Sequence, residues 1–174
     1  MLSSIQPSSA DWQAQLCAGH VVSFKFPPAE RRARCTGKIR PCLVLSVSNH
    51  AGVPHALVAY GTSADTLANR GHDVAIETPR AMAAAGLRRP TRFVCARRVL
   101  VPLTSPLFRP RAETGTPVLG RLALEDRRTL LDVLRAILGT AARSDRPNRQ
   151  TRPRRTLRPG PVTPTHSQHV GRPQ

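Results

Sequence analysis

The sequence predicts a mainly β fold: a small, strongly bent antiparallel sheet followed by a C-terminal helix. Two observations lead to this prediction. Short apolar runs and runs that alternate between polar and apolar residues dominate the body of the chain, as in half-buried strands. Residues 123–138 are amphipathic with helical periodicity, and Glu125 and Asp126 favour the N-terminal end of that helix. The pattern therefore favours an SH3-like small barrel over an alternating βαβ arrangement.

The first strands form the centre of this prediction. Residues 20–26 alternate, which places Val22, Phe24 and Phe26 on one face, and a pair of prolines ends the run. Residues 41–61 are predicted to form a hairpin, because two strongly apolar runs flank a turn of sequence Asn-His-Ala-Gly.

The later elements are shorter and more widely spaced. In the helix at 123–138 we expect five apolar side chains to share one face: Leu130, Leu131, Leu134, Ile137 and Leu138. The other expected elements are a leading helix at 9–17, a strand at 72–77, a short helix at 79–85 ended by Gly86, strands at 91–95 and 98–103, and a loop at 104–120.

The charge of the chain points to a polyanionic partner. The 174 residues carry a net charge of +17, and Lys25 and Lys38 are the only lysines. Nucleic acid is the simplest polyanion that such a surface attracts. The alternative is that the arginines reflect biased coding composition and a solvated surface. The net charge supports binding to a polyanion and gives no information about the fold.

Cysteine spacing and hydropathy indicate the compartment. No two of the four cysteines have CxxC spacing, so we expect no zinc site, and Cys42 and Cys95 lie in apolar runs as buried thiols. The chain has no apolar stretch suited to a secretory signal or a membrane span. We therefore expect a cytoplasmic protein with no membrane partner.

The composition also divides the chain. Residues 1–17 are expected to be an N-terminal extension and residues 18–142 a single domain. Residues 143–174 contain eight arginines and one aspartate with few large apolar side chains, so we expect a disordered basic tail.

Arg40, Thr62 and Ser63 are the first candidates for a phosphate site. Pro41 disfavours the α conformation at Arg40, so that a planar guanidinium is held at the start of a strand. Thr62 and Ser63 close the next strand, and their hydroxyls can donate to a phosphate. The alternatives are an exposed arginine beside a strand and ordinary turn chemistry.

Further candidates surround these residues. His20, His50, His55 and His72 are possible general acids or bases, and His72 is the most interesting because it follows the Thr/Ser loop. The basic loop before Arg40 is either an electrostatic funnel for single-stranded RNA or DNA or a solvated loop; its cationic residues are Arg31, Arg32, Arg34 and Lys38.

The carboxylates do not suggest a metal site. Asp65, Asp73 and Glu77 are spread over a loop and a strand, whereas Mg²⁺ needs clustered oxygen ligands. We therefore expect no cofactor, and phosphodiester chemistry that does not use a metal ion.

The order of these segments resembles the PemK/MazF toxins of type II toxin–antitoxin systems. The resemblance covers residues 18–139 and rests on GHVVSFKFPP, GKIRPCLVLSV, VAYGTS, HDVAIE, AGLRRPTRF, RRVLVPL and the Leu-rich helix. It implies an SH3-like barrel, usually a homodimer, that cleaves single-stranded RNA at short sequences without a metal ion and is neutralised by a cognate antitoxin. It also implies that Arg40 is catalytic and that Thr62, with Ser63 beside it, is the partner of Arg40.

The sequence also departs from the family pattern. Gly19-His20 stands where many members have Gly-Asp. The strand at 91–95 lacks the aspartate that is proposed as the base in PemK-like toxins, which leaves His72 or Arg92 as substitutes. Two other functions therefore stay open: a non-catalytic nucleic-acid- or partner-binding module on the same barrel, and a toxin directed at gyrase.

Overall fold

A computed structural model describes residues 12–28, 37–64 and 71–144 of the chain. Within these ranges it contains six strands and three helices. In chain order they are α1 (Trp12–Gln15), β1 (His20–Lys25), β2 (Ile39–His50), β3 (Val53–Thr62), β4 (Asp73–Ile76), α2 (Pro79–Ala84), β5 (Thr91–Pro102), β6 (Val118–Arg121) and α3 (Leu124–Ser144). The mainly β class with a C-terminal helix is confirmed.

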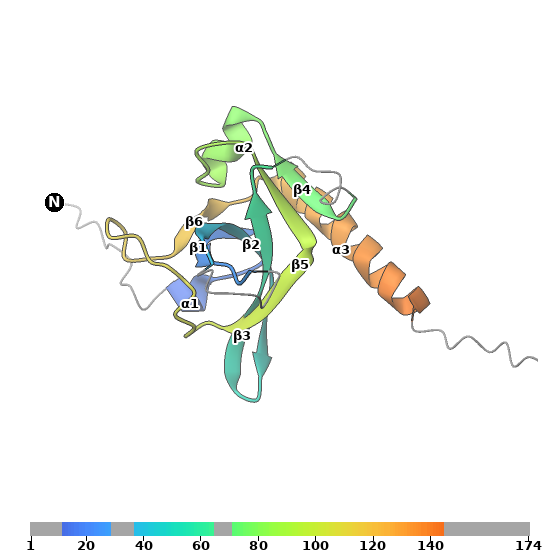
Figure 1. Ribbon diagram of the computed structural model, residues 1–174, viewed down its shortest axis with the longest axis horizontal. Coiled ribbons are helices and arrows are strands. Elements are labelled where there is room, and N and C mark those ends of the chain that lie inside the picture. Colours follow the sequence, from blue (N-terminus) through green and yellow to red (C-terminus); the bar gives the residue numbers. More distant parts are fainter. Residues whose placement is uncertain (1–11, 29–36, 65–70, 145–174) are drawn as a thin grey trace, which may run out of the picture.

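The strands form one curled antiparallel sheet in the order β4-β5-β3-β2-β1-β6. Figure 1 shows β2 and β3 in the middle of this sheet, with the tip of their hairpin reaching beyond the other strands. Ala51 and Gly52 both have positive φ values and make the tight turn of that hairpin. The predicted hairpin over residues 41–61 is therefore confirmed and slightly longer than expected.

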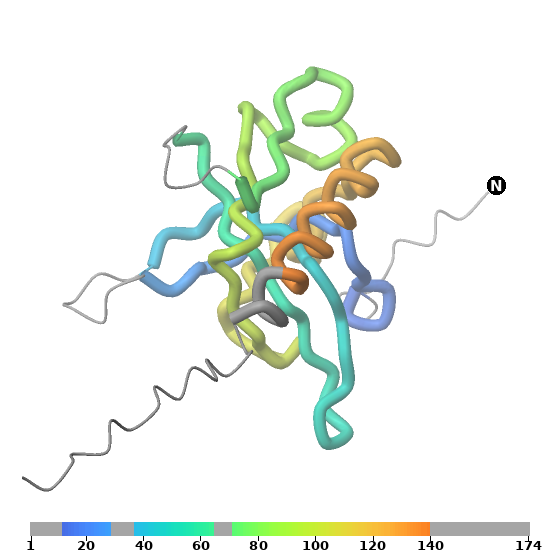
Figure 2. The backbone as a smooth tube through the Cα atoms, turned by 90° about the vertical axis from the view of Figure 1, so that its right-hand side faces the viewer, coloured from blue at the N-terminus to red at the C-terminus, as the bar shows by residue number. Residues whose placement is uncertain are grey.

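Both faces of the sheet are buried. One cluster joins Leu43, Leu45 and Phe93 to α2 and to Leu130 of α3, and Figure 2 shows α3 running across this face. The second cluster, on the opposite face, contains Val22, Phe24, Phe26, Cys42 and Val44 and is covered by α1 and the segment after β5. Alternation along β1 and β2 thus supplies apolar side chains to both faces.

The structure corrects the expected end of the sheet. Residues 91–95 and 98–103 belong to a single strand, β5, whose register against β3 shifts between Ala59 and Tyr60. Part of the expected loop at 104–120 is β6, which pairs with β1 at the edge of the sheet. A bulge interrupts the alternation of β5, and β6 is too short to have a periodicity of its own.

The expected face of the terminal helix is also partly wrong. Leu130, Leu134 and Ile137 pack on the first cluster, whereas the side chains of Leu131 and Leu138 are 52% and 68% exposed. The five predicted side chains cover a wider part of the helix surface than the part that contacts the sheet.

The short helix α2 begins and ends as its sequence requires. Thr78 is the N-cap, its Oγ1 accepts a hydrogen bond from the Ala81 N–H, and Pro79 occupies the first turn. Gly86 follows the helix with a φ of +66°, and a Cβ there would lie 2.0 Å from the Leu119 carbonyl oxygen of β6. The close approach of these two backbones fixes the turn that leads into β5.

Replacing Gly86 tests this contact, with Gly52 as the matched control. Both glycines have positive φ values, but a Cβ at Gly52 meets nothing within 4 Å. Gly52→Ala should lower the free energy of unfolding by about 1–2 kcal/mol, from backbone strain alone. Gly86→Ala should cost a further ~1–3 kcal/mol because the backbone of β6 must move. Chemical denaturation of both variants measures the difference, and equal losses would contradict the contact.

Candidate functional site

A pocket lies where β2 begins and β3 ends. Its volume is about 590 Å³, and it is lined by residues 38–41 at the start of β2, residues 61–63 at the end of β3, the turn between α2 and β5, Arg111 and Leu119. Four of the predicted site residues, Lys38, Arg40, Thr62 and Ser63, line this single pocket.

Close contact between β2 and β3 holds one wall of the pocket together. A Cβ at Gly61 would lie 1.9 Å from the Pro41 carbonyl oxygen, so only glycine fits there. The absence of a side chain at Gly61 allows the Arg40-Pro41 segment to lie directly against the Gly61-Thr62-Ser63 segment. The two motifs are far apart in the sequence and adjacent in the fold.

The turn between α2 and β5 forms the opposite wall. Arg88 and Arg89 are exposed there, and the buried Thr91 donates its hydroxyl proton to the Arg89 carbonyl oxygen at 3.0 Å. This bond fixes the backbone that carries the two arginines. Arg88 and Arg89 were not predicted as site residues, although two consecutive arginines soon after a helix-ending glycine are a usable signal.

The charge of the pocket is positive throughout. The described residues that line it include no acidic side chain. Five of them are cationic: Lys38, Arg40, Arg88, Arg89 and Arg111. Clustered guanidinium groups raise the local potential and bind phosphate oxygens in pairs. The pocket is therefore suited to an anionic ligand with several oxygens, such as a phosphodiester.

The guanidinium of Arg40 is held by β3. Its Nη1 donates to the Tyr60 hydroxyl at 2.6 Å and to the Gly61 carbonyl oxygen at 3.4 Å, and its Cζ lies 4.7 Å from the centroid of the Tyr60 ring. Thr62 Oγ1 accepts the Ala64 N–H at 3.1 Å, which leaves the hydroxyl proton of Thr62 to donate. The expected turn chemistry of Thr62 is thus present and compatible with ligand binding.

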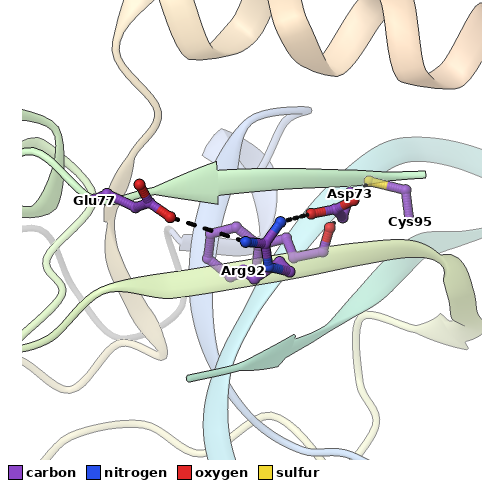
Figure 3. Close-up of polar contacts among 5 residues, drawn as sticks. Asp73, Glu77, Arg92 and Cys95 are labelled. Atoms are coloured by element: carbon purple, nitrogen blue, oxygen red, sulfur yellow. Dashed lines mark hydrogen bonds and ion pairs between the residues drawn. The ribbon is translucent and has the colours of Figure 1, made fainter. Parts of the chain in front are cut away.

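Arg92 and His72 are not among the residues that line this pocket. Arg92 lies directly opposite Thr62 in the β3–β5 pairing, but its guanidinium pairs with Asp73 and with Glu77 at 3.9 Å (Figure 3). The Asp73 carboxylate, which is nearly buried, therefore joins β4 to β5. His72 precedes β4, and its carbonyl oxygen accepts the Cys95 N–H.

Other predicted residues lie apart from the pocket or outside the structure. Arg31, Arg32 and Arg34, the expected tail at 143–174 and the extension at 1–17 fall wholly or largely outside the described residues. His50 and His55 lie at the hairpin tip, with their ring centroids 5.1 Å apart.

The two buried cysteines, Cys42 and Cys95, are held in their thiol form. Burial raises the pKa of the Cys42 thiol to about 12, and burial, with the charge of Asp73 acting in the same direction, raises that of Cys95 to about 12. Neither supplies a thiolate nucleophile at neutral pH. Within the described ranges, no three His, Cys, Asp or Glu side chains gather into a set that could hold a metal ion. None of the helices described here is long and apolar enough to cross a membrane.

His20, a predicted candidate for a general acid or base, is half-buried at the start of β1. Its Nδ1 accepts the Cys17 N–H at 3.1 Å. Burial, followed by the charges of Arg121 and Arg127, lowers its pKa below the ordinary 6.5. The fold therefore prefers the neutral imidazole.

This preference predicts a pH dependence of stability. Because the unfolded chain binds the His20 proton more readily than the folded chain, the free energy of unfolding should fall as pH drops from about 7 to about 5. His20→Asn keeps an acceptor for the Cys17 N–H and should flatten that part of the curve. Thermal unfolding across this pH range measures both proteins, and unchanged slopes in the variant would refute the assignment.

Comparisons with known proteins support the same fold. The sequence pattern of the family described as PemK-like, MazF-like toxin of type II toxin-antitoxin system matches residues 18–138. A search of curated proteins found no match. The family match covers more than half of the chain, and the curled sheet with its C-terminal helix agrees with it. The chain belongs to the PemK-like, MazF-like toxins of type II toxin–antitoxin systems.

Proposed function

We propose that this chain is an endoribonuclease toxin that cleaves single-stranded RNA at a short sequence without a metal ion. The observation that carries the proposal is the convergence of Arg40, Thr62 and Ser63 in one pocket with four further cationic side chains. In this proposal Lys38, Arg88, Arg89 and Arg111 bind the RNA backbone on either side of the cleaved bond.

The proposed reaction is an attack by the 2′-hydroxyl of the RNA on the adjacent phosphorus. The bond from the 2′-oxygen to phosphorus forms as the bond to the 5′-oxygen breaks, which gives a 2′,3′-cyclic phosphate and a free 5′-hydroxyl. One proton leaves the 2′-hydroxyl and one reaches the departing 5′-oxygen. Arg40 neutralises the charge that develops on the phosphorane, and Thr62 orients the phosphate.

The partners follow from the family. We propose a cognate antitoxin whose acidic segment occupies the cationic pocket, a homodimeric assembly, and a cytoplasmic site of action. In this proposal residues 18–142 are the toxin domain, residues 1–17 are an extension, and the basic residues 143–174 strengthen the attraction to RNA.

A second function, RNA binding without cleavage, is favoured by one specific observation. The described residues that line the pocket include no histidine and no carboxylate, so none of these side chains is an ordinary general base. Asp73, on the strand next to β5, is engaged with Arg92. A binding module would give salt-sensitive RNA affinity and no new RNA ends.

Substitutions in the pocket test the first function against the second. Arg40→Ala should lower kcat by about 100- to 1,000-fold because a donor to the developing charge is lost. Thr62→Ala should lower it by about 10-fold or more through poorer orientation. Purified proteins are incubated with single-stranded RNA, and the 5′ ends of the products are mapped.

The matched control is Arg128→Ala, which removes an exposed arginine of α3 and should leave kcat unchanged. Cleavage that survives both Arg40→Ala and Thr62→Ala would show that the site assignment is wrong. Salt-sensitive binding by the native protein without new 5′ ends would replace the nuclease with the binding module.

A further inference from the structure

Two arginines that come from different strands lie against the ring of Tyr60 in β3. The Cζ atoms of Arg40 and Arg97 lie 4.7 Å and 4.0 Å from the centroid of the Tyr60 ring. Arg97 also lies 5.4 Å from the centroid of Phe26, whose ring packs edge-on against Tyr60 at 5.2 Å. β2, β3, β5 and the end of β1 thus meet at one aromatic centre.

The bulge in β5 explains why Arg97 reaches this ring. Ala59 pairs with Arg98 but Tyr60 pairs with Val94, so residues 95–97 have no counterpart on β3. A bulge of this kind redirects the side chains within it. Arg98, the residue after Arg97, donates from its Nη1 to the Cys95 carbonyl oxygen at 3.1 Å. This hydrogen bond connects the two ends of the bulge.

The two guanidinium groups are not neutralised by described residues. Between described side chains, the ion pairs are formed by Arg92 with two carboxylates and by Arg135 with Asp132. Arg40 and Arg97 are therefore held near each other by the face of the Tyr60 ring and by its hydroxyl, against the repulsion of like charges. An anion with several oxygens, bound between them, would relieve that repulsion.

Thr62 lies on the same face of β3 as Tyr60, whose ring holds Arg40 and Arg97. Thr62 follows Tyr60 by two residues, and strand side chains at this spacing project to the same side. Arg97 already lies over the Tyr60 ring and Phe26 packs at its edge, so the ring is engaged by protein groups rather than open for stacking on a base.

We propose that Tyr60 is a positioning residue for Arg40 and that Arg97 is a second arginine ligand for the RNA phosphate that Arg40 contacts. The Tyr60 hydroxyl fixes the direction of the Arg40 guanidinium, and its ring holds Arg97 beside it, so that both bind oxygens of the same phosphodiester chain. Tyr60 and Arg97 do not line the pocket themselves and are connected to it through Arg40. This inference rests on the proposed RNA substrate and extends its binding site beyond the pocket by these two residues.

The first experiment measures binding separately from cleavage. The probe is a single-stranded 2′-O-methyl RNA of mixed sequence, which lacks the attacking hydroxyl and cannot be cleaved by the proposed route. Arg97→Gln should weaken binding about 10-fold and lower the slope of log affinity against log salt by about 0.7, the loss of one phosphate contact. Arg128→Gln removes an exposed charge on α3, away from the bulge, and should leave the slope near that of the native protein.

The second experiment isolates the Tyr60 hydroxyl. Tyr60→Phe keeps the ring and removes the acceptor for Arg40. Two-dimensional NMR of the arginine side chains should show slowly exchanging Arg40 Nη protons in the native protein and lose them in this variant, at an unchanged unfolding temperature. On cleavable RNA the same variant should lose about 10-fold in kcat with KM unchanged, because orientation rather than binding is impaired.

The results separate the inference from the proposed function. If the native protein cuts no RNA, the nuclease proposal fails, while the salt slopes and the Arg40 signals still decide the inference. Equal slopes for Arg97→Gln and Arg128→Gln would overturn the role of Arg97. Arg40 signals that persist in Tyr60→Phe would overturn the positioning role of Tyr60.

Discussion

Burial of both faces of β2 and β3 is the constraint on which the rest of the structure depends. These strands occupy the middle of the sheet, with Leu43 facing α3 and Val44 facing the opposite cluster. Over residues 42–45 of β2, where both faces are buried, a polar side chain would need a buried partner. Polar chemistry is therefore displaced to the strand ends, and Arg40 and Thr62 lie where the apolar runs begin and stop.

Much of the fold could be predicted because its signals are local. Alternation identified β1 and β4, two apolar runs around a turn identified the β2–β3 hairpin, and Gly86 marked the end of α2. The continuity of β5 depends on its pairing with β3 on one side and β4 on the other, which no short window contains. The register of β6 against β1 is likewise a property of the whole sheet.

The site was predictable to the same extent and for the same reason. Arg40-Pro41 and Thr62-Ser63 flank a hairpin whose pairing the sequence indicated, so their meeting followed from local pattern. Arg88, Arg89 and Arg111 line the pocket together with Gly86 and Leu119, where the turn after α2 packs against β6, and this contact joins segments far apart in the sequence. The roles of Asp73 and Arg97 depend on which way a side chain turns across a strand, and composition carries no information about that.

The pairing of β1 with β6 also affects how the protein is made. Every other strand pairing joins segments that are closer in the sequence, but β1 must wait for β6, just before α3, before its outer edge is covered. An uncovered edge strand is a template for association with other chains, and contacts between distant segments form late in folding. As the chain leaves the ribosome, the outer edge of β1 therefore stays open to a second polypeptide until β6 has been made.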